Sequence, residues 1–292
     1  MINYSFIIPH YNKPDLLERC VKSIPQRDDI EIIIVDDNSD EDKKPTINRR
    51  GVEIVFLDAS QSKGAGRARN VGMKKAHGKW LLFADADDFY NEGFLSFLDK
   101  YSDSNNDVIY FGAESKNSET LEPLNRTVNY QSVIKGYDGL EEKQSLLKYK
   151  FHFPWNKMVN AQFISKHRIH FEEVLQGNDT MFSYMVGYFA KNIETIPEDL
   201  YVYTYTKNSI TTRKKDMAHY LCGVENYFKQ AAFLSYVGKP EYGLTPSRYL
   251  IRCYRQYGFE GMIKVIFIML VHWNEIRRQS TKYKKSCNND NK

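Results

Sequence analysis

The sequence predicts an α/β protein built on a mostly parallel β-sheet. Three features of residues 1–112 indicate this class: apolar runs of strand length, helical periodicity between them, and acidic residues directly after two of the runs. Continuously apolar runs are typical of parallel strands, because helices cover such strands on both faces. Open α/β sheets bind ligands beyond the carboxyl ends of their strands. We therefore expect a ligand site among the residues that follow the strands.

The first strand, helix and second strand form a βαβ unit. Residues 4–9 form a strand that ends in a proline, which cannot donate to a central ladder. Pro14 suits the first turn of the following helix. Residues 31–35 form the second strand, and Asp36 and Asp37 follow it directly. Strand, helix and strand in this order predict a parallel sheet with a right-handed crossover.

A glycine-containing segment precedes the second helix. After a third strand at 52–57, residues 62–73 read Ser-Lys-Gly-Ala-Gly-Arg-Ala-Arg-Asn-Val-Gly-Met. Backbone N–H groups and the guanidinium groups of Arg67 and Arg69 at a helix start suit a phosphate or a pyrimidine edge. The spacing differs from the dinucleotide-binding and Walker patterns, and a glycine before a helix is also an ordinary turn. Both interpretations stay open.

The fourth strand carries the densest acidic cluster. Residues 80–84 are continuously apolar, and Asp85, Asp87 and Asp88 follow. Asp85 and Asp87 lie on the same side of an extended chain, and crowded carboxylates need a cation or hydrogen-bond donors. Mg²⁺ and Mn²⁺ prefer oxygen ligands, and Mg²⁺ combines one or two carboxylates with substrate phosphates. A metal site and a solvated turn are the two interpretations.

Beyond residue 90 the sequence predicts further α/β structure and one candidate base. We expect a helix at 94–98, strands at 107–112 and 201–205, irregular or antiparallel structure at 113–137, and a polar loop at 208–213. Asp179 precedes a strongly apolar helical run. A carboxylate in this place either caps the helix or serves as a general base that faces a cleft.

From Asp216 the pattern is helical and ends in a basic run. Residues 262–273 are nearly all apolar, and basic residues dominate 277–292. The apolar run is either a buried helix or an interfacial helix whose basic flank rests on an anionic membrane. We therefore expect two domains, an α/β domain at 1–215 and a helical extension with a basic tail at 216–292.

The composition excludes several functional classes. The 292 residues are 42% hydrophobic, and 41 basic against 37 acidic residues give a net charge of +4, too mild to indicate nucleic-acid binding. Four scattered cysteines without a Cys-x-x-Cys pair argue against a zinc site and a disulfide framework. We expect no signal peptide, and no apolar stretch approaches the ~20 residues that cross a bilayer. The expected location is cytoplasmic, with peripheral contact on the inner face of the membrane left open.

Four motifs follow one another at the expected strand ends. They are Ile-Ile-Pro-His-Tyr-Asn at 7–12, Ile-Ile-Val-Asp-Asp-Asn-Ser-Asp at 33–40, Gly-Ala-Gly-Arg-Ala-Arg-Asn-Val-Gly at 64–72 and Phe-Ala-Asp-Ala-Asp-Asp at 83–88. In this order they resemble glycosyltransferase family 2, inverting enzymes of the GT-A fold. The resemblance is strong to about residue 112 and absent after about 215. Weaker matches lie at 154–157, 178–179 and 208–210.

The resemblance implies a role for each matching residue. Asp179 matches the catalytic base, and Asn178 stands where the family commonly has a glutamate, so a supporting acid is missing. Asp87 would bind the cofactor, Mn²⁺ or Mg²⁺, which bridges the donor diphosphate. The nucleotide-binding residues implied are Pro9, Tyr11 and Asp37 at the base, with Tyr11 stacking on it, Arg69 at the base or diphosphate, and Asp85 at the ribose.

The implied reaction moves a sugar from a nucleotide-sugar donor, a UDP-sugar first, to a hydroxyl of a glycan or lipid-linked glycan in bacterial surface-polysaccharide synthesis. Asp179 would deprotonate the acceptor, which attacks the anomeric carbon in line. Two alternatives stay open: a non-catalytic nucleotide-sugar-binding protein and a nucleotidyltransferase. Residues 10–13 lack the glycine that the triphosphate loop of a nucleotidyltransferase normally needs.

Overall fold

The computed structural model describes residues 1–61, 64–174, 176–206, 216–243 and 246–289. The start of the glycine-containing segment at 62–63, the polar loop at 208–213 with its motif at 208–210, and the end of the basic run at 290–292 lie outside the described residues. The chain folds as two compact units. The N-terminal unit comprises Met1–Val174 and Asn178–Arg213, and the C-terminal unit comprises Leu175–Gly177 and Lys214–Lys292.

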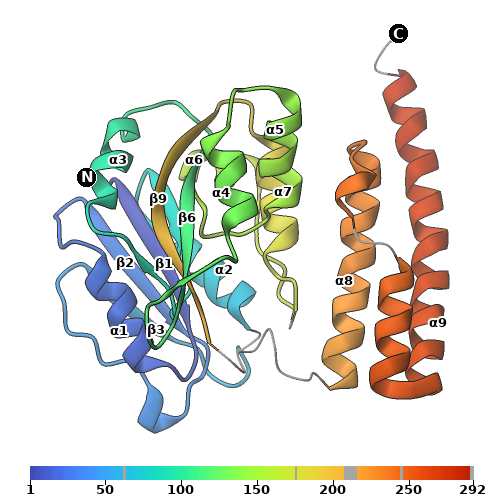
Figure 1. Cartoon of the computed structure of the whole chain (residues 1–292), viewed down its shortest axis with the longest axis horizontal. Helices are drawn as coiled ribbons and strands as arrows, with labels where there is room; N and C mark the ends of the chain where they lie inside the picture. Colours follow the sequence, from blue (N-terminus) through green and yellow to red (C-terminus); the bar gives the residue numbers. More distant parts are fainter. Residues whose placement is uncertain (62–63, 175, 207–215, 244–245, 290–292) are drawn as a thin grey trace. The chain divides into compact units, whose positions relative to one another are not determined.

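The N-terminal unit is organised around a mixed sheet that has nine strands in the described residues (Figure 1). Four parallel strands lie in the order β3-β2-β1-β4, and β8 joins them in antiparallel orientation to the parallel pair β6 and β9. The predicted, mostly parallel α/β sheet is therefore confirmed. The strands are β1 (Tyr4–His10), β2 (Ile30–Asp36), β3 (Val52–Phe56), β4 (Trp80–Phe83), β5 (Phe89–Tyr90), β6 (Val108–Asn117), β7 (Pro123–Leu124), β8 (Lys157–Asn160) and β9 (Ile193–Tyr205).

The register places the two acidic strand ends on one edge of the sheet. His10 of β1 pairs with Asp36 at the end of β2, and Ile7 of β1 pairs with Phe83 at the end of β4. Because these parallel strands run in the same direction, the segments after β2 and β4 leave the sheet at its carboxyl edge. This edge is where the sequence predicts the ligand site.

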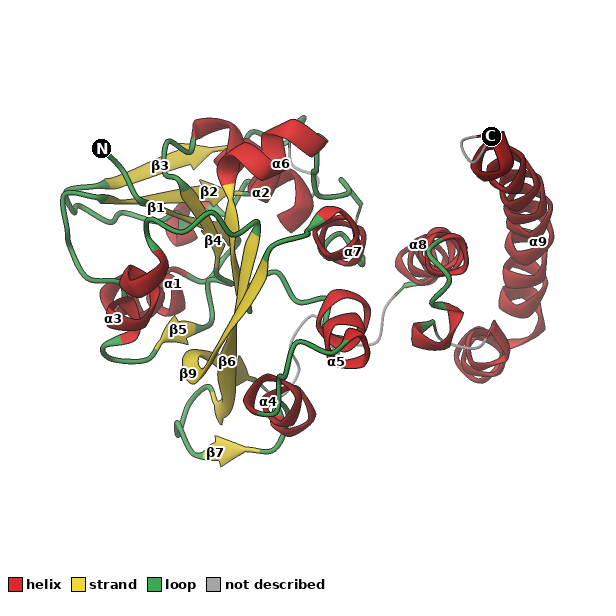
Figure 2. Cartoon of the chain, turned by 90° about the horizontal axis from the view of Figure 1, so that it is seen from above, coloured by secondary structure: helices red, strands yellow, loops and turns green. Residues whose placement is uncertain are grey.

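Helices cover both faces of the sheet (Figure 2). Helices α1 and α3 lie on one face, and α2, α6 and α7 lie on the other. Helix α4 packs against β6 and β9. The bounds are α1 (Pro14–Ser23), α2 (Ala65–Lys75), α3 (Phe94–Leu98), α4 (Val128–Lys135), α5 (Glu141–Ser145), α6 (Ala161–His167) and α7 (Thr180–Phe189).

Two regions differ from the expected elements. The stretch 113–137, expected to be irregular or antiparallel, continues β6 to Asn117, adds the short antiparallel strand β7 and contains α4. The expected strand at 201–205 is only the end of β9, which has 13 residues. The reason is long-range pairing of β6 with β9, which bulges at Gly112, where a Cβ would lie 2.6 Å from the Glu198 carbonyl oxygen. Local sequence patterns do not report such pairing.

The C-terminal unit consists mainly of α8 (Met217–Tyr236) and α9 (Pro246–Asn289). Helix α9 is interrupted at Gly258, whose φ of 69° belongs to a region that side chains rarely adopt. Val224, Cys253 and Val265 form the buried centre of this unit. Among the described helices, none combines the length and the apolar character needed to span a membrane.

Candidate active site

A buried hydrogen-bond network fixes the loop after β1. Lys13 N–H donates to His10 Nε2 at 3.0 Å, which leaves Nδ1 as the donor to Asp36 Oδ1 at 2.7 Å. The Ser39 hydroxyl donates to the same Asp36 oxygen at 2.6 Å. The Tyr11 side chain stands on this fixed loop and is 52% exposed. A planar ligand can therefore stack on its ring.

Asp37 joins the segment after β2 to the start of α2. Its backbone N–H donates to the His10 carbonyl at 2.8 Å, and its carboxylate accepts from the Gly64 N–H at 2.9 Å. Pro9 lies one position before His10 on β1, in register with Val35. The residues predicted to hold the nucleotide base thus lie on adjoining segments of the same edge.

Arg69 connects three segments that are far apart in the sequence. Its Nη2 donates to Asp85 Oδ1 at 2.5 Å, and its Nη1 donates to Asn178 Oδ1 at 3.0 Å. The guanidinium carbon lies 5.3 Å from the centroid of the Phe171 ring, and Arg69 is only 5% exposed. Asn178, at the position where the resemblance implies a glutamate, therefore accepts a hydrogen bond from Arg69.

Gly66 permits the close approach of α2 to residues 172–178. A Cβ at Gly66 would overlap the Glu172 carbonyl oxygen and lie 2.9 Å from Asn178 Cβ. Glu172 N–H in turn donates to the Asn178 carbonyl at 3.1 Å. Gly66 of the third motif is therefore required by the close packing beside Arg69.

Asp87 has a fixed backbone and an accessible carboxylate. Its carbonyl oxygen accepts from Arg19 Nη2 and from the Thr204 hydroxyl, each at 2.6 Å. Its Oδ2 accepts from Lys13 Nζ at 2.6 Å, and the Asp87 side chain is 27% exposed. The carboxylate can thus exchange its partner while the loop stays in place.

Asp88, the third acid of the cluster, has a structural role. It is 1% exposed and accepts from the Tyr201 hydroxyl at 2.9 Å and from Thr204 N–H at 2.7 Å. The Tyr201 oxygen accepts from Asp85 N–H at 3.0 Å. Burial, with the charges of Asp87 and Asp85, raises the pKa of Asp88 well above its ordinary value. Asp88 and Tyr201 therefore hold the segment that presents Asp85 and Asp87.

Asp179 occupies the N-cap position of α7, yet its described side chain makes no capping hydrogen bond. The capping interpretation is thus not supported. Burial raises the pKa of Asp85, Arg69 opposes this shift, and the negative charges of Asp87 and Asp179 add to it. The structure therefore brings the three carboxylates within electrostatic reach of one another.

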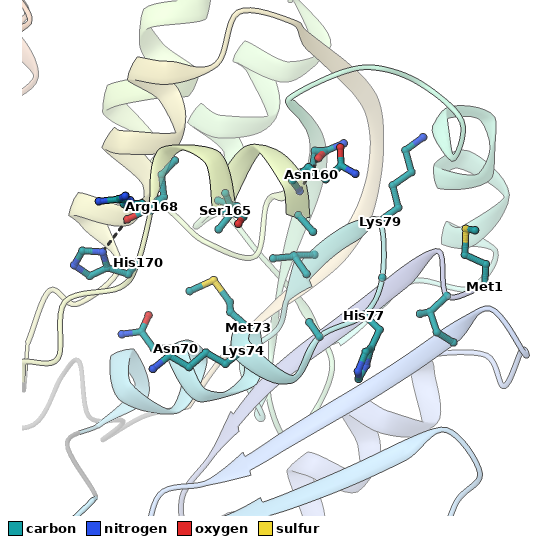
Figure 3. A pocket seen from close by; sticks show the side chains of 18 of the residues that line it. Met1, Asn70, Met73, Lys74, His77, Lys79, Asn160, Ser165, Arg168 and His170 are labelled. Atoms are coloured by element: carbon teal, nitrogen blue, oxygen red, sulfur yellow. Dashed lines mark hydrogen bonds between the residues drawn. The ribbon is translucent and has the colours of Figure 1, made fainter.

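A separate cavity opens at the opposite edge of the sheet (Figure 3). Its volume is about 1030 Å³, and it lies between α2 and α6 beside the amino ends of β1 and β4. Its lining includes the basic residues Lys74, Lys79 and Arg168. The described lining contains none of the predicted site residues. The candidate active site is therefore the carboxyl edge of the sheet and not this cavity.

Sequence reasoning did not single out Arg19, Thr204 or Tyr201. These residues fix Asp85 and Asp87 by hydrogen bonds to their backbone atoms. Thr204 and Tyr201 belong to β9, more than 110 positions along the chain from the acids. Their alternation as a strand was visible in the sequence, but their position beside the acids required the fold.

The family model of glycosyl transferase family 2 matches residues 5–167, more than half of the chain. The chain belongs to glycosyl transferase family 2. This match confirms the family that the four motifs indicate. It includes every predicted nucleotide- or metal-binding residue, whereas Asp179 lies beyond it.

Several curated proteins are similar to this glycosyltransferase. EpsH of Bacillus subtilis (strain 168), named as a glycosyltransferase, is 25% identical over 250 residues, which cover 81% of this chain and 70% of EpsH. The poly(ribitol-phosphate) beta-N-acetylglucosaminyltransferase TarS of Staphylococcus aureus is 24% identical over 218 residues, 70% of this chain and 35% of TarS. The GalNAc(5)-diNAcBac-PP-undecaprenol beta-1,3-glucosyltransferase of Campylobacter jejuni is 36% identical over 104 residues, 34% of each chain. This chain thus spans about a third of the last two proteins.

Solved structures of S. aureus TarS share the fold. The crystal structure of TarS 1–349 in complex with UDP-GlcNAc has a TM-score of 0.61 and 18% identity, over 80% of this chain and 66% of that chain. The complex of TarS 1–349 with UDP has a TM-score of 0.57 and 17% identity, over 85% of this chain and 69% of that chain. The predicted GT-A class is confirmed by this likeness.

Proposed function

We propose that this family 2 glycosyltransferase moves a sugar from a UDP-sugar to a hydroxyl of a glycan or lipid-linked glycan, with inversion at the anomeric carbon. The observation that carries the proposal is the convergence of Arg69, Asp85, Asp87 and Asp179 at the carboxyl edge of the sheet. The TarS complexes with UDP-GlcNAc and UDP support the donor class. The names of the relatives, which specify poly(ribitol-phosphate) and an undecaprenol-linked glycan, support the acceptor class and a role in surface-polysaccharide synthesis.

The donor would lie along the edge from Tyr11 to Asp85. The base stacks on the exposed Tyr11 ring, beside Pro9, and the Asp37 carboxylate accepts from a base N–H group. The guanidinium fork of Arg69 matches the geometry of a diphosphate, and the Asp85 carboxylate accepts from ribose hydroxyls. Arg69 would exchange its present contacts for the donor without leaving the site.

A hard divalent cation fits Asp87. In the described part of the chain no cluster of three or more His, Cys, Asp or Glu side chains could hold a metal. Mg²⁺ does not need such a cluster, because it usually combines one or two carboxylates with substrate phosphates and water. The accessible Asp87 carboxylate meets this requirement. When bound, Mn²⁺ or Mg²⁺ would neutralise charge on the leaving diphosphate.

Asp179 is the proposed general base. Its carboxylate takes the proton of the acceptor hydroxyl while that oxygen forms the new bond to the anomeric carbon. The bond from this carbon to the diphosphate breaks on the opposite side, and the nucleoside diphosphate carries away the electron pair. A single in-line displacement inverts the configuration.

We also propose peripheral contact of α9 with the inner face of the membrane. After Gly258, Phe259, Ile263, Phe267 and Leu270 are 65%, 51%, 67% and 60% exposed. Their spacing places them on one stripe of the helix. In the sequence, residues 277–285 then contain five basic and no acidic residues. An apolar stripe followed by basic residues suits anionic lipids and would bring the enzyme to a lipid-linked acceptor.

A nucleotide panel tests the donor assignment. We expect UDP with Mn²⁺ to raise the midpoint of thermal unfolding, because a ligand of the native state stabilises it by mass action. If UDP binds, UDP-sugars are then assayed with an acceptor, and the matching donor should release UDP. Binding of UDP without any turnover would favour the non-catalytic alternative. Release of pyrophosphate from UTP and a sugar phosphate would favour a nucleotidyltransferase.

A further inference from the structure

Lys157 is fully buried at the start of β8. It is 0% exposed, and its Nζ donates to the Phe153 carbonyl and lies 3.3 Å from Ser183 Oγ. Its Nζ also lies 5.4 Å from the centroid of the Tyr110 ring. A buried ammonium loses its hydration, which destabilises the folded state unless the charge has a compensating partner. The position of this amine therefore needs an explanation.

The amine lies beside the first turn of α7, which follows directly after Asp179. Ser183 is one turn beyond Asp179, and its N–H donates to the Asp179 carbonyl at 3.0 Å. Residues four apart share one face of a helix, so the Lys157 amine approaches this face. Burial lowers the pKa of Lys157 to about 7, and the negative charge of Asp179 acts in the opposite direction.

The other titratable groups around Lys157 are neutral or exposed. Burial lowers the pKa of His152, with opposing influence from Asp179, so this imidazole is neutral at pH 7. Burial raises the pKa of Tyr110, which keeps its hydroxyl protonated. Lys150 is exposed to solvent. The negative charge that acts on the Lys157 ammonium is therefore that of Asp179.

Two carboxylates of the site form ion pairs with basic side chains. Asp85 pairs with Arg69 and Asp87 with Lys13, and both carboxylates are partly accessible. Lys157 differs because its amine is fully buried and therefore cannot touch the nucleotide-sugar donor or the acceptor substrate. We propose that Lys157 is a positioning residue for transfer, whose buried ammonium attracts the Asp179 carboxylate and fixes the first turn of α7. This inference rests on the proposed role of Asp179 as general base.

Lys157→Met separates positioning from packing. Methionine has nearly the length of lysine and carries no charge, so it fills the same space without the unfavourable burial of an ammonium. A merely structural lysine would lower Tm and kcat together when replaced. A lysine retained for function would leave Tm unchanged or raise it while kcat falls.

The test measures UDP release and donor KM from pH 6 to pH 9 with the full chain. At pH 6 we expect the kcat of Lys157→Met to fall by about tenfold or more, with donor KM within about twofold and Tm equal or higher. The ratio of wild-type to variant kcat should shrink toward pH 9, because the wild-type amine then loses its proton. Ser183→Ala keeps the ammonium and is the matched control, with kcat expected within about threefold of wild type.

Two results overturn the inference alone. One is a kcat of Lys157→Met within about twofold of wild type at pH 6. The other is a parallel fall of Tm and kcat, which assigns Lys157 to packing. A wild-type chain that transfers no sugar overturns the proposed function, and this inference with it.

Discussion

Lys13 Nζ lies 2.6 Å from Asp87 Oδ2, so the proposed metal ligand is paired with an ammonium group. The two residues follow β1 and β4, and their side chains are 33% and 27% exposed. An ammonium compensates a carboxylate in the same way as a bound cation. A metal ion at Asp87 would therefore compete with Lys13 for the negative charge of this carboxylate, and the two side chains can be tested separately.

Replacing the two partners should change Mn²⁺ binding in opposite directions. Asp87→Asn removes the ligand charge and should abolish the Mn²⁺-dependent part of the stabilisation by UDP. Lys13→Met removes the competitor and should tighten Mn²⁺ binding without nucleotide by about threefold, the scale of a partly exposed ion pair. Thermal unfolding with UDP, with and without Mn²⁺, measures the first effect, and calorimetric titration with Mn²⁺ measures the second.

The Asp138–Lys143 pair offers a matched control. Lys143 Nζ lies 2.8 Å from Asp138 Oδ2, both side chains are partly exposed, and neither is a predicted site residue. Asp138→Asn should leave Mn²⁺ binding unchanged. A full Mn²⁺ effect in Asp87→Asn would remove Asp87 from the proposed metal site.

Gly66→Ala should damage both stability and donor binding. The new Cβ meets the Glu172 carbonyl and Asn178, so the segment that holds Arg69 must shift. We expect a loss of about 1–3 kcal/mol in the free energy of unfolding, together with weaker UDP binding. Chemical denaturation and UDP titration measure the two effects.

Gly93→Ala serves as the control for Gly66→Ala. Gly93 has a φ of 75° and open space around its Cβ position. This variant should lose about 1–2 kcal/mol through backbone strain alone and bind UDP normally. Normal UDP binding by Gly66→Ala would show that the close approach of α2 does not control the donor site.

The pH dependence of stability should reveal the buried Lys157. The pKa of this amine is lowered to about 7 in the folded protein, from an ordinary value near 10.5. Between these values the unfolded chain binds more protons, so the contribution of Lys157 to the free energy of unfolding increases with pH. The buried ammonium therefore destabilises the folded protein fully below pH 7, and this destabilisation disappears as pH approaches 10.5.

Lys157→Met lacks this titration. Its advantage in Tm over wild type should therefore be largest near pH 6.5 and vanish toward pH 10. Thermal unfolding of both proteins across this range provides the measurement. A Tm difference that is independent of pH would show that the amine titrates normally in the folded protein.

The apolar stripe of α9 should control membrane binding. Phe267→Ser with Leu270→Ser reduces the exposed apolar surface, so binding to vesicles with anionic lipids should weaken by about tenfold or more in sedimentation assays. Phe56→Ser is the matched control, because Phe56 is 50% exposed in the N-terminal unit. Equal binding of wild type and double variant would contradict the proposed contact.

The sequence predicted the acidic edge because strand ends are local features. Buried apolar runs and the acids after them identify β2 and β4, and parallel topology then brings Asp37 and Asp85 to one edge. The resemblance added Arg69, which the structure places against Asp85. The roles assigned to these residues in binding and catalysis stay predictions.

The sequence could not identify the residues that hold the acids. Arg19 and Tyr201 donate hydrogen bonds to, or accept them from, backbone atoms of Asp87 and Asp85. In the sequence, an arginine in a helix or a tyrosine in a strand looks like any other surface or core residue. Lys157 follows several aromatic residues in the sequence, and its burial and its approach to α7 depend on the fold. Such contacts arise from chain segments far apart in sequence and carry no local signal.

Transfer by Asp179→Asn tests the central claim most directly. The variant keeps the size of the side chain and removes the base, so UDP binding with Mn²⁺ should equal that of wild type. Sugar transfer should fall by about 100-fold or more. Transfer at the wild-type rate would contradict the account and direct attention to Glu172 or Glu173 as the base.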